Sequence, residues 1–169
     1  MTGQARFCPH CGLRLRPPGA PISAYRETLE RGRRLRGLGK PWYRVAIWCF
    51  QDARSRRPGD VEPLLEIART YRAAGHPRRA RRWYRRAVRM RRDCYEAWAE
   101  GATCFAQHAH FRRLRWLRRA ILLRPADPVV LRELTWDLAR LGGWQRWWAE
   151  RWLWRLCSEN VLTGREGLC

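Results

Sequence analysis

Apolar residues recur along the chain at the three- and four-residue intervals of an amphipathic helix. The intervals i, i+3, i+4 and i+7 are occupied by Leu64, Ile67, Ala68 and Tyr71, whereas a strand would alternate. Breaks rich in glycine and proline separate such segments at residues 39–41, 58–60, 75–77, 125–128 and 142–143. The pattern therefore predicts an all-α chain of short helices joined by tight turns.

The helical pattern repeats with a period of 33–34 residues. One copy contains the small and aromatic residues Ala80, Tyr84 and Ala87, and the copy before it has Ala46, Phe50 and Ala53 in the same order. A similar shift in the other direction relates Leu64, Ala68 and Tyr71 to Trp98, Ala102 and Phe105. Small residues let two helices approach closely, and the aromatic residues fill the space beside them.

This order of large, small and aromatic positions around Gly75 resembles the tetratricopeptide repeat (TPR). The resemblance implies an α-solenoid of about four antiparallel helix pairs, expected at residues 23–58, 61–92, 95–125 and 128–157. We expect a repeat domain over 21–158, preceded by a cysteine knuckle and linker over 1–20 and followed by a tail over 159–169. Two departures stand out: a two-residue insertion near residues 39–42, and Gly32 where alanine is common.

The same resemblance implies a groove lined by the first helix of each pair. The residues carried over to that wall mix both signs of charge, which suits an irregular polypeptide better than a uniform polyanion. The Lys/Asn clamp of chaperone-binding members is not reproduced, because neither residue type occurs there. The predicted protein-binding groove contains Arg33, Arg36, Glu66, Arg69, Arg72, Glu100, Gln107, Arg132, Trp136 and Arg140.

The formal charge of +21 adds a second class of partner. Lys40 is the only lysine among 36 basic residues, so the choice of arginine over lysine reflects in part a bias toward GC-rich codons. That bias does not explain an excess of more than two basic residues for each acid. A field of this size attracts RNA, DNA, anionic lipid or an acidic protein.

The arginines are densest on the predicted second helices. Residues 78–92 hold nine arginines and no acid, in a stripe opposite the apolar face. Phosphates of a nucleic acid or an acidic protein would neutralise this face, and a merely solvated face is the third interpretation. This predicted basic outer face contains Arg78, Arg82, Arg85, Arg89, Arg112, Arg115 and Arg119.

The last predicted helix is rich in tryptophan. Three interpretations stay open for it: part of the core, a protein interface, since tryptophan and arginine are enriched at binding hot spots, or a helix at a membrane surface. Its tryptophans are Trp144, Trp147, Trp148, Trp152 and Trp154, interleaved with arginine.

Near the start of the chain, the sequence Phe7-Cys8-Pro9-His10-Cys11-Gly12 resembles one half of a zinc ribbon. Two thiolates separated by two residues can bind one tetrahedral ion, which predicts a structural zinc site at Cys8 and Cys11 with His10 as a further ligand. The remaining ligands would come from His76, His108, His110, Cys157, Cys169 or a partner. The alternatives are a thiol-oxidase motif, which lacks its βαβ context here, and two free thiols.

The residues contain no catalytic constellation, no secretory signal and no apolar run long enough to span a membrane. We therefore expect a cytoplasmic, non-enzymatic scaffold, an accessory subunit that mediates protein–protein interaction within a larger complex. The alternatives are a ribosome- or RNA-associated basic factor and a peripheral membrane protein anchored by the tryptophan-rich helix. No small-molecule substrate is expected.

Overall fold

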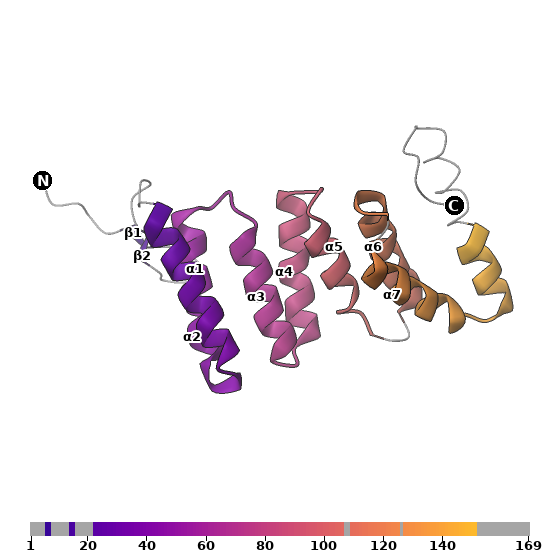
Figure 1. Cartoon of the computed structure of the whole chain (residues 1–169), viewed down its shortest axis with the longest axis horizontal. Coiled ribbons are helices and arrows are strands. Elements are labelled where there is room, and N and C mark those ends of the chain that lie inside the picture. Colours follow the sequence, from indigo (N-terminus) through magenta and orange to yellow (C-terminus); the bar gives the residue numbers. More distant parts are fainter. Residues whose placement is uncertain (1–5, 8–13, 16–21, 107–108, 126, 152–169) are drawn as a thin grey trace, which may run out of the picture. The chain divides into compact units, whose positions relative to one another are not determined.

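The computed structural model describes residues 6–7, 14–15, 22–106, 109–125 and 127–151 (Figure 1). A further helix covers residues 143–151. The other helices, in chain order, are α1 (Ile22–Gly37), the 3-10 helix η1 (Lys40–Trp42), α2 (Tyr43–Arg56), α3 (Glu62–Ala73), α4 (Pro77–Met90), α5 (Tyr95–Ala102), α6 (His110–Leu123) and α7 (Pro128–Ala139). Apart from Ile22, which begins α1 one residue early, these helices fall within the four expected pairs, so the predicted helical-repeat fold is confirmed.

The chain forms two compact units, and the division between Arg92 and Asp93 lies inside the repeat domain expected over 21–158. In unit 1 (residues 1–92), α1 packs on α2, α2 on α3 and α3 on α4. In unit 2 (residues 93–169), α5 packs on α6 and α6 on α7. The helical pattern did not predict the strand pair of β1 (Arg6–Phe7) with β2 (Arg14–Leu15), which is antiparallel.

The recurring small residues lie where the helices meet. Their exposed fraction is 0% at Ala46, Ala53, Ala68, Ala80, Ala87, Ala102 and Ala120. Tyr84 and Phe50 are equally buried, as expected for the aromatic positions beside the alanines. In unit 2, Arg113 stands at the position of Ala80, and the Trp116 ring fills the core in edge contacts with Trp98 and Phe105. The repeat therefore encodes close helix packing, with larger side chains in unit 2.

Both departures from the repeat have a physical explanation. A methyl group at Gly32 would lie 2.5 Å from the ring of Phe50, so only glycine allows α1 to approach α2 at that point. The insertion forms η1. Gly39, the residue before η1, has a left-handed backbone conformation with φ of 98°. Gly75 takes a similar conformation between α3 and α4, where the sequence predicted a turn.

A tyrosine–aspartate contact that the sequence analysis missed occurs once in each unit. The Tyr25 hydroxyl donates to Asp60 Oδ2 at 2.8 Å, and Asp60 Oδ1 accepts from the backbone N–H of Glu62 at the start of α3. Tyr95 donates to Asp127, whose carboxylate accepts the Val129 and Val130 N–H groups at the start of α7. Each contact ties the first helix of a pair to the cap of the next first helix.

We predict that Gly32→Ala lowers the free energy of unfolding by about 1–3 kcal/mol, because the added methyl must displace the buried Phe50 ring. Gly37→Ala is the matched control: a Cβ at Gly37 meets nothing within 4 Å, and alanine favours the helix by up to about 1 kcal/mol. Urea unfolding followed by circular dichroism measures both. Equal stability of the two variants would contradict the close approach of α1 and α2.

A second prediction concerns alkaline pH. Burial raises the pKa of Tyr25 well above its usual value, and the hydrogen bond and charge of Asp60 raise it further. The folded protein therefore keeps this proton while the unfolded chain loses it above about pH 10, so the contribution of Tyr25 to stability is complete below that pH and is lost above it.

Tyr25→Phe should accordingly cost about 1 kcal/mol of unfolding free energy at pH 8, through the lost hydrogen bond. The stability difference from wild type should then shrink by up to about 1.4 kcal/mol per pH unit above pH 10. Urea titrations across this pH range provide the measurement. A difference that stays constant with pH would show that Tyr25 does not hold its proton in the folded state.

Candidate functional site

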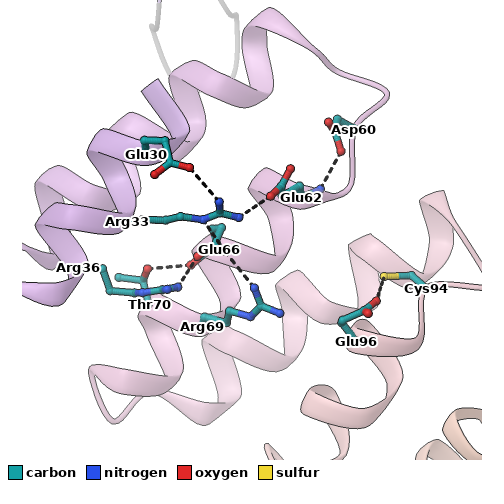
Figure 2. A network of polar contacts seen from close by, with 10 residues as sticks. All are labelled: Glu30, Arg33, Arg36, Asp60, Glu62, Glu66, Arg69, Thr70, Cys94 and Glu96. Carbon is teal, nitrogen blue, oxygen red and sulfur yellow. Dashed lines mark hydrogen bonds and ion pairs between the residues drawn. The ribbon is translucent and has the colours of Figure 1, made fainter. Parts of the chain in front are cut away.

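In unit 1, the first helices α1 and α3 share a network of ion pairs centred on Glu66 (Figure 2). The carboxylate of Glu66 is only 1% exposed and accepts from Arg33 Nε at 3.2 Å and from Arg69 Nη1 at 3.0 Å. Arg36 donates to its other oxygen. Arg33 also reaches Glu62 and, at 3.3 Å, Glu30. We call these six residues the Glu66 network.

The Glu66 network is electrically balanced, because three arginines meet three glutamates. Burial opposes the charge on Arg33, but attraction to Glu66 and hydrogen bonds to Glu62 and Glu66 outweigh it, so the pKa of Arg33 is raised. The attraction of three guanidinium groups offsets the desolvation free energy of the buried Glu66 carboxylate. The network therefore joins α1 to α3 and leaves little net charge for a partner.

The predicted groove residues of unit 1 are thus brought together, with one difference from expectation. Arg33, Arg36 and Arg69 converge as expected for one wall, and Arg72 lies exposed on α3. Glu66, which the resemblance placed on the binding wall, is buried beneath the arginines instead. The physical reason is that α3 packs on both α2 and α4, which covers most of its surface.

In unit 2, α6 and α7 meet through a second charged cluster, centred on Arg113. This arginine contacts Glu133, and its Nε lies 3.0 Å from Asp137 Oδ2, without hydrogen-bond alignment. His110 Nδ1 lies 3.4 Å from the other Asp137 oxygen. Burial raises the pKa of Asp137, and the attraction of Arg113 and His110 offsets this only in part. We call these residues, with Trp136 and Arg140, the Arg113 cluster.

Trp136 and Arg140 are the exposed part of the Arg113 cluster. The Trp136 side chain is 41% exposed, and the guanidinium carbons of Arg113 and Arg140 lie 5.1 Å and 4.7 Å from the ring centroid. Of the groove residues predicted in this unit, Trp136 and Arg140 are therefore brought together. Arg132 is exposed on α7 and forms no ion pair with a described residue. Glu100 is half-buried on α5, and Gln107 lies outside the described residues.

Arg113 was not among the predicted site residues, and the structure buries it. Helical spacing could have found it, because Arg113 precedes the buried Leu117 by four residues and Ala120 by seven. Asp137 was missed for a similar reason: it follows the buried Val130 and Leu134 at seven and three residues. Both lie on apolar faces, where a charged residue needs a partner of opposite sign.

The predicted basic outer face is exposed in the structure. On α4, the side chains of Arg78, Arg82, Arg85 and Arg89 are exposed and form no ion pair among the described residues; we call them the α4 stripe. Arg112, Arg115 and Arg119 are likewise exposed on α6. What these residues bind stays a prediction.

The tryptophans of the helix 143–151 are not core residues. Trp144, Trp147 and Trp148 are 71%, 58% and 57% exposed, so the core interpretation is wrong for these three. The helix buries Ala149 instead, and the Arg151 guanidinium lies over the Trp147 ring at 5.5 Å. Trp152 and Trp154 lie outside the described residues.

One cavity of about 380 Å³ lies between α6 and the helix 143–151 within unit 2. The buried side chains of Leu114 and Ala149 contribute to its wall, and the exposed rings of Phe111 and Trp148 flank it. Arg115 and Arg118 add positive charge to the same wall. This cavity was not predicted from the residue pattern, because it depends on how two helices meet.

The predicted zinc ligands Cys8, His10 and Cys11 lie outside the described residues, so zinc binding stays a prediction; β1 and β2 flank this segment. Within the described ranges, no three His, Cys, Asp or Glu side chains are grouped to hold a metal. Burial raises the pKa of the Cys49 thiol, as expected for a cysteine that packs as a small apolar side chain. None of the helices described here is long and apolar enough to cross a membrane.

No protein-family profile and no curated protein matches this chain. Among solved structures, the first TPR domain of Spaghetti (RPAP3) bound to an HSP90 peptide has a TM-score of 0.63 at 18% identity, covering 70% of this chain and 95% of that chain. The Sgt2 TPR domain from Aspergillus fumigatus has a TM-score of 0.63 at 16% identity, and the match covers 91% of this chain and 92% of that domain.

PcrH, solved in complex with the chaperone binding region of PopB, has a TM-score of 0.59 at 17% identity. The match covers 74% of this chain and 100% of the PcrH chain. At such identities the likeness shows the fold, which is that of TPR helix pairs, as the repeat pattern predicted.

We predict that Glu66→Gln lowers the free energy of unfolding by about 2–4 kcal/mol, because three clustered guanidinium groups lose the charge that neutralises them. The matched control is Glu30→Gln, whose side chain is 57% exposed and has one contact with Arg33; it should cost less than about 1 kcal/mol. Urea unfolding measures both. Similar values for the two variants would contradict a central role of Glu66.

Proposed function

We propose that this protein is a non-enzymatic TPR-like scaffold, an accessory subunit that holds a polypeptide partner within a larger complex. The observation that carries the proposal is the cavity between α6 and the helix 143–151. Its volume of about 380 Å³ is sufficient for one or two apolar side chains, and its wall combines aromatic rings with arginines. Tryptophan and arginine are the residue types most enriched at protein-binding hot spots.

The partner that we propose follows from the composition of the cavity wall. Leu114 and Ala149 provide buried apolar surface, and Phe111 and Trp148 can close over an inserted side chain. Arg115 is exposed at the wall, with Arg112 and Arg119 exposed on the same helix. A segment with an aliphatic or aromatic anchor next to acidic residues complements this arrangement in both shape and charge.

The solved structures similar to this chain support a peptide partner. One is bound to the HSP90 peptide SRMEEVD, which places two glutamates and an aspartate around a valine, and another holds the chaperone binding region of PopB. The Trp136 ring between Arg113 and Arg140 is a second exposed aromatic group in unit 2 that a longer partner can contact.

The proposal is tested by selecting peptides from a random displayed library on the whole protein and measuring their Kd by fluorescence anisotropy. Selected peptides should carry acidic residues beside an apolar anchor. Phe111→Ala and Trp148→Ala should each weaken binding by about tenfold or more, which corresponds to about 1.4 kcal/mol.

Trp144→Ala is the matched control, because Trp144 is the more exposed tryptophan of the same helix and does not line the cavity. It should change Kd by less than about twofold. Peptides that bind all three variants as tightly as wild type would contradict the cavity as the docking site, and circular dichroism verifies that each variant is folded.

A further inference from the structure

We propose that the α4 stripe, formed by Arg78, Arg82, Arg85 and Arg89, is a second binding site, which takes the phosphate backbone of a nucleic acid without reading its sequence. This site lies in unit 1, whereas the proposed peptide site lies in unit 2. The two inferences are therefore independent, and each can fail without the other.

The first argument is the regular spacing of the four arginines. They follow one another at intervals of four, three and four residues, which places them on one face of α4. With a rise of about 1.5 Å per residue, neighbouring arginines are about 5 Å apart along the axis, and the whole stripe extends over about 16 Å. Such a row of guanidinium groups suits a polymer with charge at regular intervals.

The second argument is the distribution of charge in the chain. Residues 1–92 contain 24 arginines and lysines against six aspartates and glutamates, a formal charge of +18, whereas residues 93–169 hold 12 against nine, a charge of +3. Nearly all the excess charge therefore belongs to unit 1, which points to a polyanion as its partner.

The third argument is that the acids of unit 1 are occupied elsewhere. Glu30, Glu62 and Glu66 belong to the Glu66 network, and Asp52 pairs with Arg56 on α2. Asp60 accepts from Tyr25. The remaining acid, Glu27, lies on α1, and α4 itself contains none. The α4 stripe therefore keeps its charge, and the mutual repulsion of its arginines favours a neutralising ligand.

Neighbouring arginines are held in place by aromatic rings. Arg86 lies over the Trp83 ring at 4.5 Å, and Arg54 of α2 lies over the same ring at 5.7 Å. Arg79 lies over Tyr71 at 6.0 Å. These cation–π contacts restrict the motion of the guanidinium groups beside the α4 stripe. These groups therefore lose less conformational entropy when they contact phosphates.

A nucleic acid fits this surface better than an acidic protein does. Protein interfaces need an apolar centre, but the only large apolar side chain exposed on α4 is Met90, at its last residue. The exposed tryptophans of unit 1, Trp42 and Trp48, belong to η1 and α2 rather than to α4. Contacts through phosphates alone depend on charge and on the bidentate geometry of arginine, both of which the stripe provides.

The test measures binding of the full-length protein to a labelled, mixed-sequence RNA of about 20 nucleotides and to a DNA duplex of similar length, by fluorescence anisotropy across a salt series. The stripe variant replaces Arg78, Arg82, Arg85 and Arg89 with glutamine. Its affinity for both probes should fall by about thirtyfold or more. The slope of log K against log salt should also become shallower by about three, which corresponds to four phosphate contacts.

The matched control has glutamine at four other exposed arginines of unit 1 that form no described ion pair. These are Arg26, Arg31, Arg34 and Arg44. The control removes the same charge and should weaken binding by less than about threefold. A variant with lysine at the four stripe positions should keep the salt slope and lose affinity severalfold, because lysine cannot bind phosphate bidentately. This lysine variant also tests the proposal if the glutamine variant of the stripe does not fold.

Three results would overturn the proposal: equal losses in the stripe and control variants, which would show that affinity follows net charge alone; unchanged binding in the stripe variant; or no binding to either nucleic acid. Stripe-dependent binding to polyglutamate, or to vesicles of phosphatidylcholine and phosphatidylserine, in the absence of nucleic-acid binding would assign the stripe to an acidic protein or a lipid surface instead.

Discussion

The paired helices of this protein pack so closely that only small side chains fit at most of the repeating contact positions. Alanines that recur at the repeat period are completely covered, and Gly32 lets the Phe50 ring lie against α1, where even a methyl group would collide. Since the helices are so close, charged side chains on their inner faces lose contact with water. The Glu66 network and the Arg113 cluster follow from this packing, because each gives a buried charge a partner of opposite sign.

The fold could be predicted largely because it depends on local pattern and on period. Apolar spacing marked the helices, glycine and proline marked the turns, and Ala80, Tyr84 and Ala87 recurred at a fixed distance. What escaped prediction depends on contacts between distant residues. The hydrogen bond from Tyr25 to Asp60 joins residues 35 positions apart, and neither residue type requires it. The division between Arg92 and Asp93 likewise leaves no mark in the repeat pattern.

The candidate sites were predictable only in part, for a related reason. A helical wheel places Glu66 and Arg69 near one another, but it does not reveal that Glu66 is covered and bound by three arginines. For the exposed tryptophans, residue type allowed three interpretations, and burial removed the core interpretation for those that are described. The cavity beside Trp148 depends on the angle between two helices, which the sequence does not specify.

The positions of the acids determine which arginines are available to a partner. From the sequence, the arginines of α1, α3, α4 and α6 look alike, and all contribute to the same net charge. In the structure, Arg33, Arg36 and Arg69 are neutralised by glutamates, and Arg113 is held by Glu133 and Asp137. None of the described acids pairs with the α4 stripe, so the field of unit 1 acts there on an approaching ligand. Net charge alone therefore says little about the binding surface until the ion pairs within the fold are known.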